Sequence, residues 1–560
     1  MQPKKILLSI LIITGTFFTS CEKLLNPDPA NFYAESRFWK DPVFAEGVLS
    51  NAYIVLPSSY TLDETATDDA VTNVTTSSYV RMNKGEWSSQ FDPMTSWSTA
   101  YKAIYYVNYF LTIVDKVEWS WTSAVKNEYF RQRFTGEAYG MRAWWNFELL
   151  KRHGGKTADG SLLGIILLDK PMDNTSDWST LKRSSYDACI QAIYADIDKA
   201  MAILPLDYAN ITGNVDYNSV YTPDNKGRMC GRILKALKSR VALHVASPAF
   251  GSTQAKWEAA ADAAAKSLAD IGGVTGLSAT GRKFYLTLTD ADIIWRGNVQ
   301  SINTWESNNF PPTLNGKGQT NPSQNLVDAF PMATGYPITV APTYNPQNPY
   351  VGRDPRLKDY IVYKGNTIGT TVINTNTEDA QNGLNRAVLA TRSGYYLKKL
   401  LRENVNIVPP SNTVQQHFVT YLRYTEMFLN YAEAANEAWG PTADPRGYGF
   451  TPTTIIAAIR KRGGLAQPDL YLGTITTQAA MRDLIRNERR IELCFEGFRF
   501  WDLRRWNANL TETAKGMQIT NNVYTSIDIE ERMYDPYKNF GPIPYGDLLK
   551  NKQLVQNDGW

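Results

Sequence analysis

Helical periodicity over two long stretches is the feature that most limits what this 560-residue chain can fold into. Apolar residues recur at helical spacing from Trp97 to Phe250, with an alanine-rich extension to Asp270, and again from Tyr421 to about Trp506. Between these stretches, residues 272–416 are rich in Gly, Pro, Asn and Thr, which favours turns, long loops and short strands. The sequence therefore predicts a mainly α fold, in which a helical scaffold carries a large irregular, loop-rich lobe.

Several predicted helix pairs show the interlock of small and large residues that is typical of tetratricopeptide repeats. They lack the constant repeat length of about 34 residues. One pair joins residues 231–246 to residues 257–270, where five alanines leave room for a close neighbour. We expect a degenerate tetratricopeptide-like scaffold in which an amino-terminal part, residues 21–271, is interwoven with residues 272–560 into one body.

The first residues have the pattern of an export signal. Lys4 and Lys5 precede an uncharged run from Ile6 to Phe18, which is too short to cross about 30 Å of hydrocarbon as a helix. Small residues then precede Cys21, in an arrangement that resembles a bacterial lipobox. We expect residues 1–20 to be a lipoprotein signal peptide and Cys21 to be the lipidation site. A plain secretory signal with an incidental cysteine is the alternative.

Charge and motif content argue against several functions. The chain has 58 basic and 55 acidic side chains, a net charge of +3, which is too even for a nucleic-acid-binding surface. It has no GxSxG, HExxH, Walker or Rossmann motif, and Cys189, Cys230 and Cys494 lack metal-ligand spacing. The acidic cluster from Asp63 to Asp69 lacks EF-hand spacing, which favours a solvated loop. We expect no nucleic-acid partner, no cofactor and no metal.

Two carboxylates lie on the apolar stripe of a predicted helix. Glu488 and Glu492 are four residues apart, so their Cβ atoms are about 5–6 Å apart, close to the carboxyl separation of about 5–5.5 Å in retaining glycosidases. Buried acids instead need cationic partners. The arginines available are Arg460, Arg462, Arg499, Arg504 and Arg505. We favour a structural ion-pair network, because large apolar residues surround the stripe, and keep a glycosidase as the less favoured alternative.

Aromatic residues in two polar stretches are candidates for sugar contact. One stretch holds Arg81 and Trp87 among Thr, Ser and Asn residues, and the other holds Trp295 and Trp305. An aromatic face can cover the C–H surface of a sugar while neighbouring polar groups bind its hydroxyls. For any single tryptophan, burial in the core remains the alternative.

The carboxy-terminal third carries the most specific pattern. Residues 489–506, RRIELCFEGFRFWDLRRW, are similar to the ER-x-x-EL-x-FEG-x-R-x-x-DL-x-RW signature of the SusD/RagB family, with Arg490 at a position that is usually variable. Further stretches that resemble this family are residues 136–145, 423–434 and 459–465. The chain thus resembles the glycan-binding lipoproteins of Bacteroidetes-type bacteria over nearly its whole length.

The resemblance implies a fold and a function. It implies four degenerate tetratricopeptide units, no enzymatic activity, and a lipid-anchored position on the cell-surface side of the outer membrane. The implied partner is a SusC-like TonB-dependent β-barrel transporter, to which the protein delivers captured oligo- or polysaccharide. A peptide or another nutrient is the alternative cargo.

The resemblance also guides the choice of site residues. Family ligand sites lie on variable loops, so Glu488, Glu492 and Arg499 of the signature are expected to have a structural role. Loop position and side-chain chemistry together give the expected ligand contacts, which are Asp69, Arg81, Trp87, Trp295, Trp305 and Tyr395.

Overall fold

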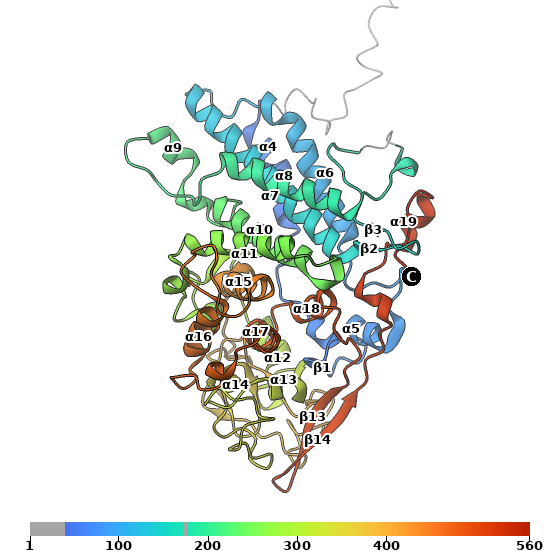
Figure 1. Ribbon diagram of the computed structural model, residues 1–560, viewed down its shortest axis with the longest axis vertical. Coiled ribbons are helices and arrows are strands. Elements are labelled where there is room, and N and C mark those ends of the chain that lie inside the picture. Colours follow the sequence, from blue (N-terminus) through green and yellow to red (C-terminus); the bar gives the residue numbers. More distant parts are fainter. Residues whose placement is uncertain (1–39, 173–176) are drawn as a thin grey trace, which may run out of the picture.

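Long helices occupy one end of the protein and the irregular segment 272–416 occupies the other, as the computed structural model shows (Figure 1). The structure describes residues 40–172 and 177–560, so the predicted signal peptide 1–20 and Cys21 lie outside the described residues. The prediction of a mainly α fold with a loop-rich lobe is confirmed. The principal helices are α4 (Pro42–Ile54), α6 (Trp97–Ile113), α7 (Ala124–His153), α8 (Tyr186–Ile203), α10 (Gly231–Ala246), α11 (Gln254–Ala269), α15 (Tyr424–Trp439), α16 (Pro452–Gly463), α17 (Gln478–Leu493) and α18 (Arg499–Arg505).

Helix α7 shows how local sequence sets these elements. The Ser123 hydroxyl accepts a hydrogen bond from the backbone N–H of Lys126 at its amino end. Its last turn carries Lys151, Arg152 and His153, whose positive or polar side chains suit the carboxy end of a helix. The helix is 30 residues long, and α6 and α8 both pack against it.

Small residues allow the close packing of α11. Ala260, Ala261, Ala264 and Ala265 are all buried, and α11 lies against both α10 and α15. This contact joins helices from the amino-terminal and carboxy-terminal stretches into one layer, and it agrees with the close neighbour that the alanines predict.

The lobe contains short elements connected by long loops. Within the described residues, its strands pair only in twos and antiparallel. The pairs are β1 (Ala70–Thr72) with β6 (Thr320–Pro322), β4 (Ile293–Arg296) with β12 (Thr420–Arg423), β5 (Gln300–Ile302) with β11 (Gln415–His417), β7 (Ile361–Val362) with β10 (Tyr396–Leu397), β8 (Thr367–Ile368) with β9 (Thr371–Val372), and the long hairpin β13 (Ala514–Thr520) with β14 (Val523–Glu530).

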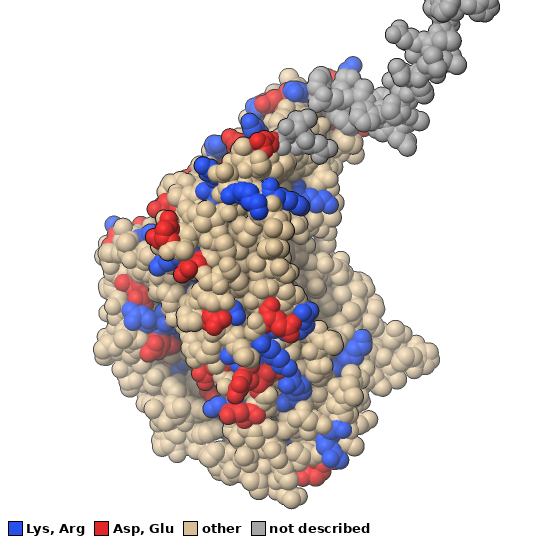
Figure 2. All heavy atoms as spheres, turned by 90° about the vertical axis from the view of Figure 1, so that its right-hand side faces the viewer, with Lys and Arg blue, Asp and Glu red and all other residues tan. Residues whose placement is uncertain are grey.

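The remaining elements are short. They include the pair β2 (Gly155–Lys156) with β3 (Leu162–Leu163), and the helices α5 (Ser78–Arg81), α9 (Val215–Val220), α12 (Thr304–Asn309), α13 (Gln324–Ala329), α14 (Pro355–Tyr360) and α19 (Tyr545–Lys550). On the face that carries α19, acidic and basic residues are interspersed, with wide uncharged areas between them (Figure 2). Across residues 40–172 and 177–560, every helix is too short or too polar to cross a bilayer.

Candidate functional site

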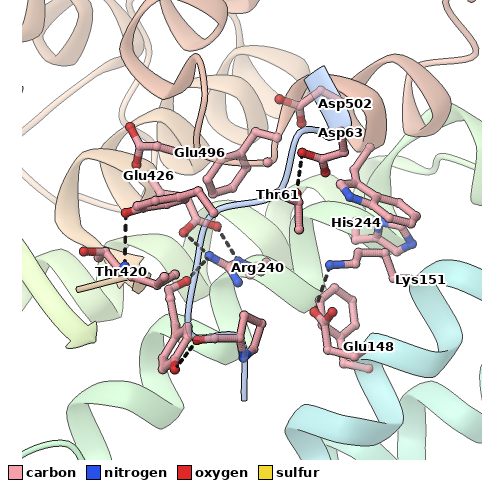
Figure 3. A pocket seen from close by; sticks show the side chains of 18 of the residues that line it. Thr61, Asp63, Glu148, Lys151, Arg240, His244, Thr420, Glu426, Glu496 and Asp502 are labelled. Carbon is pink, nitrogen blue, oxygen red and sulfur yellow. Dashed lines mark hydrogen bonds and ion pairs between the residues drawn. The ribbon is translucent and has the colours of Figure 1, made fainter. Parts of the chain in front are cut away.

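A cavity of about 180 Å³ lies where the helical layer meets the carboxy-terminal segment (Figure 3). Its walls come from residues 57–63 after α4, from the second half of α7, from α10, from the start of α15, and from residues 496–505. Segments that are far apart in the sequence therefore build one site.

Two ion pairs fix the polar side of this cavity. Arg240 of α10 donates two hydrogen bonds of 2.6 Å to Glu426 of α15. Burial alone would lower the pKa of Arg240, but the Glu426 carboxylate outweighs burial and raises it. On α7, Lys151 donates to Glu148 over 2.8 Å, and burial lowers the pKa of Lys151 to about 8 despite this carboxylate. Figure 3 shows both pairs facing the same space.

Three polar atoms on the cavity residues have no hydrogen-bond partner among the described residues. They are Nε1 of Trp144, Nε2 of His244 and Oγ1 of Thr420. Burial lowers the pKa of His244 well below its usual range, so the ring is neutral at physiological pH. Figure 3 places His244 and Thr420 on opposite sides of Arg240. All three atoms are buried, and an unpaired buried polar group costs about 1–3 kcal/mol.

Aromatic rings form the apolar side of the cavity. Tyr421, Phe498 and Trp501 are partly exposed and line it together with the buried Trp144. The Arg240 guanidinium lies 5.7 Å from the ring centroid of Trp144 and 5.5 Å from that of Phe498. The site thus combines apolar ring surface with charged and unpartnered polar groups.

The structure contradicts the expected exposure of Trp295 and Tyr395. Trp295 is 1% exposed, donates to the Gly227 carbonyl over 2.8 Å, and lies behind the cavity wall with its ring centroid 4.8 Å from those of Trp144 and Tyr421. Tyr395 is fully buried, and its hydroxyl contacts Gln324 and Tyr350. Both rings are core residues: Trp295 lies in β4, and Tyr395 directly precedes β10.

Asp69 and Trp87 are also buried. Asp69 accepts a 2.6 Å hydrogen bond from Arg490 Nε, so the acidic cluster around it is not the solvated loop that its spacing predicts. Trp87 is 3% exposed, with its ring centroid 4.9 Å from that of Trp560. Arg490 and Arg499, more than four hundred residues away in sequence, pair with Asp68 and Asp69 of the cluster, and no local signal indicates them.

Two of the expected ligand contacts remain reachable from solvent. Arg81 has a half-exposed side chain that forms a 2.7 Å ion pair with Glu86. Trp305 is partly exposed, and its ring lies 5.5 Å from that of Tyr60, which lines the cavity. Their contact with a ligand remains a prediction.

Glu488 and Glu492 lie apart from this cavity, in the protein interior. Both side chains are 0% exposed, and both pair with Arg356, over 2.8 Å in the case of Glu492. Glu492 also accepts a 2.7 Å bond from Arg462. Burial raises the pKa of a carboxyl group, but Arg462 and Arg356 hold the pKa of Glu492 at about 2. The open cleft that a glycosidase needs is therefore not found at these two carboxylates.

Arg499 has a different partner from the one expected, because it does not pair with Glu488 or Glu492. Arg499 donates to Asp68 over 2.8 Å and lies outside the group around Glu488. The central cation of that group is Arg356 of α14, which was not among the expected arginines. Arg356 follows a loop-rich stretch, so helical periodicity gives no reason to select it.

The cavity residues themselves were missed for a related reason. Trp144, Arg240, His244 and Glu426 lie on helices whose periodicity predicts core packing. The one available signal is that Arg240 and Glu426 are charged residues on largely buried helices, which indicates that they pair with each other or face a cavity.

Comparisons with known proteins agree with this architecture. A family model described as "SusD family" matches residues 292–560, and one described as "Starch-binding associating with outer membrane" matches residues 45–218. The chain is 23% identical over 518 residues to SusD-like protein P38 of Formosa agariphila, covering 89% of this chain and 90% of that protein.

Two solved structures share the fold. A SusD-like protein from Bacteroides fragilis superposes with a TM-score of 0.75 at 25% identity, covering 94% of this chain and 99% of the other. A SusD-like carbohydrate-binding protein from the same species gives a TM-score of 0.72 at 20% identity, covering 92% and 99%.

Proposed function

We propose, from the premise that this chain belongs to the SusD/RagB family, that it is a non-catalytic glycan-binding protein of the outer membrane. The family descriptions support starch-type ligands and a membrane location, and one structural relative is named for carbohydrate binding. The proposed ligand is an oligo- or polysaccharide.

The observation that carries this proposal is the set of unpartnered polar atoms beside aromatic rings. A sugar unit presents a C–H face that can pack on the rings, and hydroxyl groups that can pair with Trp144 Nε1, His244 Nε2 and Thr420 Oγ1 once side chains around these buried atoms move. The cavity of about 180 Å³ is smaller than the pockets of about 300–1,000 Å³ that enclose drug-sized ligands. We therefore propose that one end unit of the glycan enters, and that Arg81 and Trp305 contact the units outside.

The proposed cellular role follows the family. Cys21 carries the lipid that holds the protein on the outer membrane, and a SusC-like TonB-dependent barrel receives the captured glycan. Membership of the family supports this partnership. The uncharged run from Ile6 to Phe18, which lies between Lys5 and Cys21, supports the anchor.

Native gels cast with a panel of plant, algal and bacterial polysaccharides test the function. The soluble chain that lacks residues 1–21 is expected to be retarded by at least one glycan without releasing new reducing ends. Retardation with new reducing ends would contradict the absence of catalysis. A chain that no glycan retards would contradict the glycan ligand and favour the peptide alternative.

A pair of neighbouring tryptophans provides a matched test of the cavity. Both rings are 4% exposed, but Trp144 Nε1 is unpartnered on the cavity wall, whereas Trp145 Nε1 donates to the Ala52 carbonyl over 3.0 Å. Trp144→Phe should weaken glycan binding by about three- to tenfold, the value of one hydrogen bond. Trp145→Phe should lower stability more and leave binding unchanged. Equal binding by both variants would place the glycan elsewhere.

A further inference from the structure

An apolar surface projects from the end of the helical layer that lies farthest from the lobe. Two tips, where a loop enters α7 and where a loop enters α9, form it, and we call it the helical-end surface: Trp121, Val125, Ile211 and Val215, with exposed fractions of 86%, 54%, 46% and 83%. The segments 119–125 and 208–215 that carry these residues contain no charged side chain, and Glu118, Lys126, Asp207 and Asp216 border them. A tryptophan this exposed within an uncharged, projecting surface indicates a protein or membrane contact.

Hydrogen bonds hold both tips in place. The Asn218 side chain bonds both the backbone N–H and the carbonyl of Ile211, over 2.7 and 2.8 Å. The Ser123 hydroxyl donates to Asp216 over 2.8 Å, which ties the two tips together. The backbone N–H of Ser120 donates to the Asn127 side chain over 3.1 Å. The apolar side chains are therefore presented by an ordered frame, which lowers the entropy cost of using them in a contact.

The described chain begins at this same end. Glu46 of α4 lies 3.9 Å from Arg133 of α7, and further along both helices Ala52 accepts a bond from Trp145. The two helices therefore run in the same direction, and the first turn of α4 points the same way as Ala124. Figure 1 places α4 and α9 at the end opposite the hairpin β13–β14.

We infer that the helical-end surface contacts the lipid surface of the membrane, in a geometry set by the amino-terminal anchor. This inference rests on the proposed acylation of Cys21. Eighteen residues separate Cys21 from Lys40, a reach of at most about 70 Å. Tryptophan is enriched at the membrane–water interface.

Fluorescent labels at two exposed positions test the contact. The full chain with Trp121→Cys, or with Val388→Cys as the matched control, is purified from membranes, labelled, and reconstituted in vesicles of phosphatidylethanolamine and phosphatidylglycerol. Val388 is 87% exposed and belongs to segment 272–416, which lies at the other end of the molecule from α4 and α9. Cys189, Cys230 and Cys494 are buried, and burial raises the pKa of their thiols to about 11, 11 and 12, so they react slowly. The chain without either substitution is labelled in the same way, and its signal shows how much label reacts with Cys21.

Quenching by spin-labelled lipid should be at least about threefold greater for the label at position 121 than for that at 388, with the reverse order for aqueous iodide. Equal lipid quenching at both positions would overturn the inference. Shielding of position 121 from both quenchers would also overturn it and indicate a protein contact. A chain that does not stay with the vesicles removes the acylation premise and the inference with it, while gel retardation still reports on glycan binding.

Discussion

Arg356 is fully buried and contacts the carboxylates of Asp354, Glu488 and Glu492. Removing this cation leaves three acids in the interior with fewer partners, which is far costlier than the loss of an exposed pair. Arg356→Gln should lower the free energy of unfolding by about 3–5 kcal/mol, as measured by urea denaturation. Arg131→Gln is the control, because Arg131 pairs with Asp115 and Glu128 but its side chain is 36% exposed, and it should cost at most about 1 kcal/mol. Similar losses in both variants would show that the network does not stabilise the fold.

Residue chemistry alone led to the prediction that tryptophans contact the ligand, but it did not indicate which tryptophans are buried. Trp295 was expected to face the ligand, whereas Trp144, which its ring contacts at 4.8 Å, lines the cavity. Exposure is a property of tertiary packing, and a polar neighbourhood in sequence does not determine it. The ion-pair role of Glu488 and Glu492 was easier to predict, because two acids on an apolar stripe need buried cations from whichever part of the chain supplies them.

At the scale of elements, helices were predictable because their signals are local. The predicted helix at residues 231–246 has the bounds of α10, and the predicted start at Trp97 is the start of α6. Apart from the hairpin β13–β14, the strands of the lobe could not be predicted in detail, because they contain two to four residues and most pair with distant segments. Ala70 of β1, for example, pairs with Pro322 of β6. No periodicity develops over so few residues.

The alanine face of α11 gives a prediction at this scale. Ala261 is fully buried in a helix that packs against both α10 and α15, whereas Ala259 of the same helix is exposed. Ala261→Leu should lower the free energy of unfolding by about 1–3 kcal/mol, because the extra atoms force the neighbouring helices apart. Ala259→Leu adds the same atoms outside the core and should change it by less than about 0.5 kcal/mol. Urea denaturation of both variants measures the difference. An equal effect would mean that α11 is not closely packed against α10 and α15 at Ala261.

At the scale of the whole molecule, contacts cross the expected boundary near residue 271 in several places. Arg499 and Arg490 pair with Asp68, strand β1 pairs with β6, and α11 packs against α15. Neither part would keep its buried surface without the other. The chain lacking residues 1–39 should therefore unfold in urea as one unit, with coincident transitions by tryptophan fluorescence and far-ultraviolet circular dichroism. Residues 40–271 expressed alone should give no cooperative transition, because α11 then exposes the face that α15 covers. Two separate transitions in the longer chain, or a cooperative transition in residues 40–271, would show that the parts are independent domains, and the cavity between them would then depend on how they dock.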